Sequence, residues 1–487
     1  MHKKVSLFIP LSVIGLFSVA QAMLGASPVI VVMCAAAVAL PFSLLRLYGR
    51  DLYGLLGISF SVKYVGFALA AKTFYGQTLE SHLYDPYAAF ELTLLLMAIL
   101  TAVLIVARAL DPGKALFAFP MDLAGLRRLS LACICIGIAG NFAYSGGVAD
   151  TGAPASGGAG VVLGAAFREY YYFGLIAESV YAALKTNGRS FITGRLVVLF
   201  LIQALISISF NERGALASGL IAVATVAYLY DMLKIRHVVA GTLVGCFFIF
   251  IFTPVTIYLR SNKEGLSFSE FVELAESTIT KAATEPDFFK LISETQKSAT
   301  FQNANVRVPY DYYGVRSEVL DRLSFVSLVD AVYNGTRTRE PLGMEAVDQT
   351  LARVAPGFLG YDKEITMTGP GDWLSWQTGL LEPGRVMFAV FGLPMEGLAT
   401  WGLIGMIVYP FLFMLPVLYI CGRLSSFRLP FPLSVYLFVV IQHFMLDTTS
   451  DVYLVWLSRN LPVLLVSLFV LHHFVPPRRL LPHIHVA

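Results

Sequence analysis

Three ionisable side chains near the C-terminal end of the chain are candidates for acid–base chemistry. Glu396 follows Pro394 at the start of an apolar run, and His443 and Asp451 lie at the facing ends of the last two apolar runs. A carboxylate or an imidazole can accept the proton of a substrate hydroxyl. A carboxylate in the first turn of a helix is also stabilised by the helix dipole. Glu396 is therefore either a general base or a helix cap.

Five basic residues are candidates to bind a phosphate group. Arg213 opens an apolar run and Arg260 closes another, and the long polar stretch between 259 and 387 supplies Arg316, Arg322 and Lys363. A guanidinium binds phosphate with two parallel hydrogen bonds and stays charged. The simpler alternative for Arg213 is a side chain that snorkels to lipid headgroups, and for the residues of the polar stretch it is an ordinary solvated ion pair.

The same polar stretch mixes these cations with aromatic side chains that could stack on a sugar: Tyr313, Tyr361, Trp373 and Trp376. The motifs of other chemistries are missing from the sequence. It has no Gly-x-x-x-x-Gly-Lys phosphate loop, no His-Glu-x-x-His zinc helix and no Gly-x-Ser-x-Gly elbow. The sequence therefore predicts no metal site and no cofactor, and nothing in it indicates nucleic-acid binding.

The composition places these residues in a membrane protein. Of 487 residues, 57% are hydrophobic and 14% are charged, and the mean hydropathy is +0.71. A soluble protein carries about 25% charged residues. The five cysteines all lie outside the long polar stretch, so no disulfide framework is expected. We expect an all-α polytopic membrane protein.

The apolar runs are long enough to cross a bilayer, which takes about 20 helical residues. They predict twelve spans at 5–25, 28–45, 52–71, 88–107, 128–145, 163–184, 194–210, 214–232, 238–258, 388–420, 431–447 and 452–475. Pro394 and Glu396 indicate the first turn of a helix that continues to Tyr419, although the first part of that span could instead be re-entrant.

Basic residues fall on one side of this arrangement. The short loops on the other side hold only Lys72 and Arg213. By the positive-inside rule, both termini are then cytoplasmic and the long polar stretch lies outside. The basic residues expected on the inner side are Lys3, Lys4, Arg46, Arg50, Arg108, Lys114, Arg127, Arg128, Lys185, Arg189, Arg195, Lys234, Arg236, Arg423, Arg428, Arg478 and Arg479.

Four parts follow from these spans. Residues 1–258 form a bundle of nine spans, 259–387 a large extracytoplasmic loop, 388–475 the last three spans and 476–487 a cytoplasmic tail. Within the loop, a helix is expected to start around Phe268, with Ser267 or Ser269 as its N-cap. Residues Val315–Tyr333 have the apolar spacing of an amphipathic helix. The glycines and prolines of 354–380 predict an irregular connection.

Several of these features together resemble the oligosaccharide repeat-unit polymerases, the O-antigen polymerase type of bacterial polysaccharide assembly. They are Arg213-Gly214 at the start of a span, a long loop after a span that ends in Arg260, and Pro394-x-Glu396 followed by Trp401-Gly402-x-x-Gly405. The stretch from Ala355-Pro356 to Lys363 is similar to one that the family carries ahead of this last motif. The resemblance covers about residues 205–420.

The resemblance implies a metal-independent glycosyltransferase at the outer face of the bacterial inner membrane. Its substrates would be a glycan donor and an acceptor, both carried on undecaprenyl pyrophosphate, and a flippase and a chain-length regulator of the same pathway would be its partners, besides membrane lipids. Fixed cations would stabilise the leaving pyrophosphate. Two alternatives remain: the related ligase that transfers finished glycan, and a twelve-span transporter or flippase.

Overall fold

The described part of the chain in the computed structural model is built of helices. The structure describes residues 8–119, 121–145, 159–209, 213–247, 255, 259, 268–285, 288, 312–313, 324–355, 369–384, 391–429 and 431–476. Within these residues every regular element is a helix and no strand occurs. The predicted all-α fold is confirmed for this part of the chain.

Two of the helices in the first group begin at an aspartate that caps them. Asp51 and Asp85 each cap a helix by accepting a hydrogen bond from a backbone N–H three residues on, at 2.8 and 3.2 Å. Pro86 follows the second cap at a position where a missing N–H costs nothing. The elements are α1 (Phe8–Met23), α2 (Pro28–Tyr48), α3 (Leu52–Ser61), the π-helical turn η1 (Val62–Gly66), α4 (Phe67–Phe74) and α5 (Pro86–Leu110).

The second group contains α6 (Leu123–Ser145), α7 (Ala159–Arg168), α8 (Tyr170–Lys185), α9 (Gly194–Ser209), α10 (Arg213–Leu229), α11 (Ile235–Phe247) and α13 (Phe268–Thr284). The expected span 163–184 is in fact two helices that break at Glu169. Glycines on α6 allow this pair to pack closely, because a Cβ on Gly137 would lie 2.5 Å from the Tyr171 nitrogen. The helix expected from Phe268 is present.

The third group contains α16 (Val326–Thr338), α17 (Met344–Val354), α18 (Pro370–Gln377), α19 (Leu393–Tyr409), the π-turn η6 (Pro410–Met414), α20 (Leu415–Leu424), α21 (Pro432–Asp447), α22 (Ser450–Val455), the π-turn η7 (Trp456–Asn460) and α23 (Leu461–Phe474). Two expectations need correction. The amphipathic helix begins at Val326 rather than within 315–323, which lies outside the described residues, and it runs on to Thr338. The connection expected to be irregular contains α18, because Pro370 fits the first helical turn.

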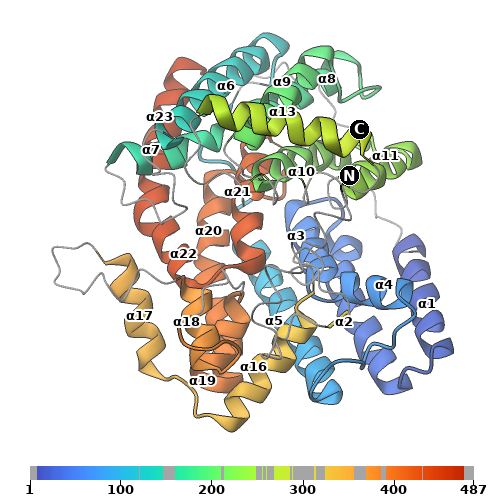
Figure 1. Cartoon of the computed structure of the whole chain (residues 1–487). Coiled ribbons are helices and arrows are strands. Elements are labelled where there is room, and N and C mark those ends of the chain that lie inside the picture. The colour runs from blue at the N-terminus through green and yellow to red at the C-terminus, as the bar shows by residue number, and fades with distance from the viewer. Residues whose placement is uncertain are drawn as a thin grey trace.

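Figure 1 shows how the three groups are arranged. The helices α16, α17, α18 and α19 occupy its lower end, and α6 to α11 occupy its upper end, with α21 between them. Helix α5 packs against α2, α16 and α20, and α8 packs against α6, α10 and α21. Segments far apart in the sequence therefore meet around α5 and α21, where the site described below lies.

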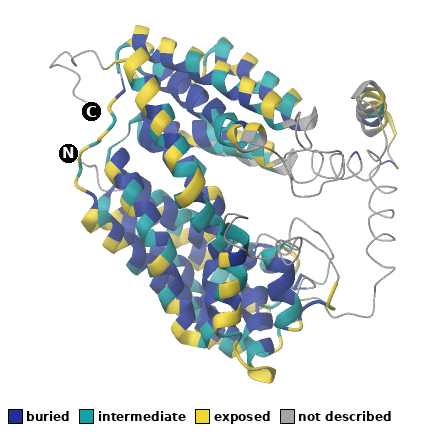
Figure 2. Cartoon of the chain, turned by 90° about the vertical axis from the view of Figure 1, so that its left-hand side faces the viewer, coloured by how far each residue is buried: buried dark blue, intermediate teal, exposed yellow. Residues whose placement is uncertain are grey.

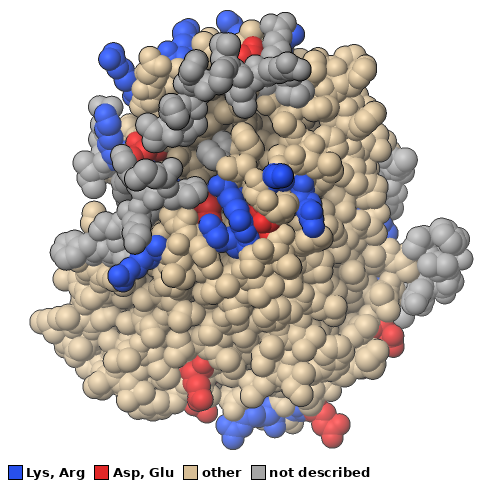
Figure 3. Space-filling view, turned by 180° about the vertical axis from the view of Figure 1, so that it is seen from behind, with Lys and Arg blue, Asp and Glu red and all other residues tan. Residues whose placement is uncertain are grey.

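Among the residues that the structure describes, six helical stretches are long and apolar enough to cross a membrane: Pro28–Tyr48, Leu52–Phe74, Pro86–Leu110, Leu123–Tyr144, Leu393–Leu424 and Ser450–Phe474. Large apolar side chains such as Leu16, Val32 and Leu205 are exposed on helix surfaces, and Figure 2 shows exposed residues recurring along the outside of the helices. Figure 3 shows charged side chains gathered in separate groups, with a broad charge-free surface between them. An apolar exterior of this kind is suited to lipid.

Helix ends that the sequence places on one side of the membrane do lie together. Arg50 after α2 pairs with Asp231 after α10 at 2.5 Å, and Arg108 near the end of α5 pairs with Asp51 before α3 at 2.7 Å.

Candidate functional site

A sharp reversal of the chain within α19 positions Glu396. The helix is interrupted at Trp401 and at Gly402, whose φ is +63°. The two arms on either side fold against each other, because a Cβ on Gly405 would lie only 2.0 Å from the Gly397 carbonyl oxygen. We call residues 393–409 the Glu396 hairpin. A continuous helix from Pro394 to Tyr419 was therefore the wrong expectation, and the reversal has the shape that a re-entrant first part of this span would need.

The end of the first arm is held by the segment that precedes α17. The backbone N–H groups of Leu342 and Gly343 donate to the carbonyls of Ala399 and Thr400 at 3.1 and 2.9 Å. The last carbonyls of a short helix otherwise lack partners. Non-helical backbone within a membrane is stable only where other parts of the protein satisfy its polar groups. The segment before α17 does this for the Glu396 hairpin, so the two form one structural unit.

Glu396 binds the start of another helix rather than its own. Its carboxylate accepts hydrogen bonds from the backbone N–H and from the hydroxyl of Ser450, each at 2.6 Å. The side chain is buried, at 3% exposure. A carboxylate at a helix N-terminus is favourable, and Glu396 therefore caps α22 across the structure.

Helix α17 closes over this contact. The Thr350 hydroxyl lies 3.3 Å from the Ser450 hydroxyl, and Arg459 donates to the Val354 carbonyl at 2.9 Å. The Arg353 guanidinium interacts with the carboxylates of Asp451 and Glu396. Burial lowers the pKa of Arg353, and the two carboxylates oppose that shift. An arginine stays charged even so, and a partly buried cation thus lies near two of the predicted acid–base residues.

A second charged pair joins η1 to α21. Lys63 in η1 forms a salt bridge with Asp447 at the end of α21. Lys63 is midway along the 23-residue stretch Leu52–Phe74, about 16 Å from either end at the rise of an α-helix. Ionisable residues at such a depth are costly and usually functional, and π-helical turns such as η1 often occur at functional sites.

Helix α16 and Tyr312 contact residues of the first group of helices. The Asp330 carboxylate of α16 accepts hydrogen bonds from the backbone N–H groups of Tyr84 and Asp85 at 2.6 and 2.9 Å. The buried Lys72 amine lies 4.1 Å from the centre of the Tyr312 ring. These contacts attach α16 and the segment around Tyr312 to the connection between α4 and α5.

The structure unites some of the predicted site residues. Glu396 and Asp451 lie in one site, whereas His443 is exposed on α21. Arg213 begins α10. Arg260, Arg316, Arg322, Lys363 and Tyr361 lie outside the described residues.

The other three aromatic candidates, Trp373, Trp376 and Tyr313, lie within the described residues. Trp373 and Trp376 belong to α18, whose terminal carbonyls at Trp376 and Gln377 accept hydrogen bonds from Arg339. The Tyr313 ring is enclosed between Phe67 and Tyr75. The Tyr313 side chain has no exposed surface.

The sequence reasoning did not identify Lys63 as part of a site or Arg353 as the partner of Asp451. A lysine in the centre of an apolar run was a signal that could have been used for Lys63. Arg353 had no comparable signal, because it is one of many cations in a polar stretch. In the described part of the chain, no three His, Cys, Asp or Glu side chains are grouped to hold a metal ion.

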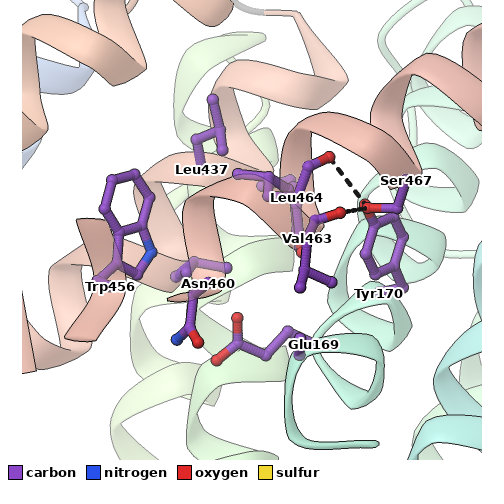
Figure 4. Close-up of a pocket in the computed structure, with 11 residues that line it drawn as sticks. Glu169, Tyr170, Leu437, Trp456, Asn460, Val463, Leu464 and Ser467 are labelled. Carbon is purple, nitrogen blue, oxygen red and sulfur yellow. Dashed lines mark hydrogen bonds between the residues drawn. The ribbon is translucent and has the colours of Figure 1, made fainter. Parts of the chain in front are cut away.

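A small pocket lies away from these charges, between α7, α8, α21 and the η7–α23 segment. Figure 4 shows Glu169 and Asn460 facing each other across it, and Tyr170 bonded to Ser467. Its volume is about 20 Å³, which is room for about one water molecule. It is too small to hold a sugar.

Fold and site together define a helical protein with apolar helices long enough to cross a membrane and with buried charges where the Glu396 hairpin meets three other helices. Comparison of the chain with protein-family models, with curated proteins and with solved structures finds no match.

Proposed function

We propose that this chain is a membrane glycosyltransferase that joins oligosaccharide repeat units carried on undecaprenyl pyrophosphate. It acts at the outer face of a bacterial inner membrane, in the assembly of O-antigen, capsule or exopolysaccharide. Twelve spans, cytoplasmic termini and an outward loop are part of this proposal. The observation that carries it is the grouping of Glu396, Asp451 and Arg353 under α17, a helix of the long polar stretch.

The chemistry of the transfer fits these residues. A carboxylate takes the proton of the acceptor hydroxyl while the acceptor oxygen attacks the first carbon of the donor glycan. The bond from that carbon to the pyrophosphate oxygen breaks, and fixed cations stabilise the charge that develops on the leaving group. Arg353 is a cation beside the carboxylates, and Arg213, Arg260, Arg316, Arg322 and Lys363 remain our candidates to bind the pyrophosphate.

Two other functions are compatible with the fold. The related ligase would use the same lipid-linked donor and the same cations with a different acceptor. A transporter or flippase is favoured by one observation, the Lys63–Asp447 pair in the middle of a span, because such pairs mark ion pathways in transporters.

The test uses Arg213→Ala, Arg260→Ala and Glu396→Gln in the native host, with the lipid-linked glycans separated on a gel. Polymerase variants lose long chains while single repeat units still reach the outside. A ligase defect leaves long chains on the carrier, and a flippase defect leaves single units trapped inside. The exposed Glu285, changed to Gln, is the matched control. Normal chain lengths in all three variants would rule out the site assignment.

A further inference from the structure

Two buried tyrosine hydroxyls close to the Lys63–Asp447 pair lack a partner. The side chains of Tyr64 and Tyr453 have no exposed surface. Within the described structure, neither hydroxyl forms a hydrogen bond. A buried polar group without a partner costs about 1–3 kcal/mol. Such groups are rare in native proteins, and each calls for a specific reason such as an unobserved ligand.

Aromatic packing holds the two rings firmly. The Tyr64 ring stacks on Phe325 with centroids 4.5 Å apart, and Phe444 meets the Tyr453 ring edge-on at 5.2 Å. Gly392, at φ +73°, brings its backbone so close that a Cβ would lie 3.3 Å from the Tyr64 hydroxyl. The hydroxyls therefore cannot turn away to find other partners.

The two hydroxyls and two carboxylates share one neighbourhood. Tyr64 follows Lys63 in η1, and the Phe444 ring that meets Tyr453 lies one turn before Asp447 on α21. Glu396 binds Ser450, one turn before Tyr453 on α22. Lys63 binds the Oδ2 atom of Asp447, and the two side chains keep 15% and 21% of their surface exposed. The charged pair is thus partly exposed, whereas the two tyrosine side chains beside it are fully buried.

The charges select the kind of ligand. Asp447 and Glu396 disfavour a phosphate, whereas a phenol can both donate to and accept from a neutral hydroxyl. Ser324, next to Phe325 in the chain, is a further buried hydroxyl without a hydrogen bond in the described structure. The surroundings therefore suit a neutral, hydroxyl-bearing ligand, which is the chemistry of a sugar.

We propose that the hydroxyls of Tyr64 and Tyr453 bind the reacting hydroxyl of the acceptor sugar and that Asp447 receives its proton. This inference rests on the proposed glycosyl transfer. The acceptor O–H bond breaks and its proton passes to the Asp447 carboxylate. The acceptor oxygen bonds to the first carbon of the donor, and the electron pair of the broken bond leaves with the pyrophosphate.

The test is a kinetic assay of the purified full chain with lipid-linked repeat units from the native host as donor and the free repeat-unit oligosaccharide as acceptor. Tyr64→Phe and Tyr453→Phe each raise the acceptor KM about three- to tenfold, the effect of one hydrogen bond, and leave the donor KM unchanged. Asp447→Asn lowers kcat about 100-fold, as loss of a general base does.

Thermal unfolding separates this role from a structural one. Tyr64→Phe and Tyr453→Phe leave Tm unchanged or raise it, because the hydroxyls they remove have no partner. The matched control is Tyr53→Phe, since the buried Tyr53 hydroxyl donates to Asp111 at 3.1 Å. This variant lowers Tm and leaves the acceptor KM unchanged.

The outcomes distinguish the two proposals. A wild-type protein that transfers no glycan to the oligosaccharide contradicts the proposed function itself. An active wild type whose two Phe variants keep the acceptor KM overturns only the inference. Phe variants that lose Tm and keep the acceptor KM overturn it too, since the hydroxyls then bind structural water.

Discussion

Glu396 and Ser450 are joined by two hydrogen bonds of 2.6 Å, one from the Ser450 backbone N–H and one from its hydroxyl. They connect the Glu396 hairpin to the first turn of α22, and both residues are buried. Because each carboxylate oxygen is already bonded to Ser450, Glu396 holds the site together whether or not it also takes part in the reaction.

The two partners of this contact should differ in their effect on stability. Glu396→Ala leaves the Ser450 N–H unpaired and the Ser450 hydroxyl with only the longer contact to Thr350, and it lowers the free energy of unfolding by about 2–4 kcal/mol. Ser450→Ala removes one bond and keeps the other, at a cost of about 1 kcal/mol. Unfolding of the detergent-solubilised protein measures both. Equal losses for the two variants would contradict the capping role.

The reversal at Trp401–Gly402 predicts an order of effects among its glycines. Gly402→Ala costs about 1–3 kcal/mol, because a φ of +63° with a ψ of −145° is a backbone conformation almost confined to glycine, although no atom lies within 4 Å of the added Cβ. Gly405→Ala costs more, because its Cβ would meet the Gly397 carbonyl oxygen at 2.0 Å. Thermal unfolding and expression level check this order, and the reverse order would contradict the hairpin.

The Asp330 contact gives a pH dependence. Burial raises the pKa of Asp330 above its ordinary value of 3.8, and the nearby Asp85 adds to this, while the hydrogen bonds from Tyr84 and Asp85 oppose it. A carboxyl group with a raised pKa in the folded state binds protons more tightly there than in the unfolded state. Its contribution to stability therefore falls as the pH rises through the raised pKa.

Asp330→Asn removes this titration. The difference in Tm between the wild type and Asp330→Asn should therefore become less favourable to the wild type as the pH rises from about 4 towards 7. Asp348→Asn on α17, which lies outside this contact, is the control. A Tm difference that favours the wild type more at higher pH would contradict the direction of the shift.

The buried Lys72 amine should hold the segment around Tyr312 in place. It donates to the Ser81 hydroxyl at 2.8 Å and to the Gln77 side chain at 3.1 Å, and it lies against the Tyr312 ring. Lys72→Met leaves these acceptors unpaired and lowers the free energy of unfolding by about 1–3 kcal/mol.

Hydrogen exchange measures the same substitution locally. Faster exchange at Tyr312 and Tyr313 is expected in Lys72→Met, and the exposed Lys185, changed to Met, should show none. Exchange at Tyr312 and Tyr313 that stays at the wild-type rate would show that Lys72 does not hold this segment.

Local rules were sufficient where an element depends on its own residues. Asp51 and Asp85 cap the helices that follow them, and Pro394 opens the helix that carries Glu396. The sequence did not decide whether the chain reverses five residues after Glu396. The positive φ of Gly402 is selected by the close approach of Gly397 to Gly405 and by the hydrogen bonds from Leu342 and Gly343. Those contacts depend on how distant segments pack.

The sequence alone determined that this is a helical chain with apolar runs of membrane-spanning length, because both properties depend on composition and spacing along one segment. Only the tertiary structure decided which charges meet. Lys63 and Asp447 are 384 residues apart, and Arg353 is one cation among many in its polar stretch. Burial costs allow such groups inside only where partners from other helices reach them, and the packing of α3, α17, α19, α21 and α22 fixes those partners.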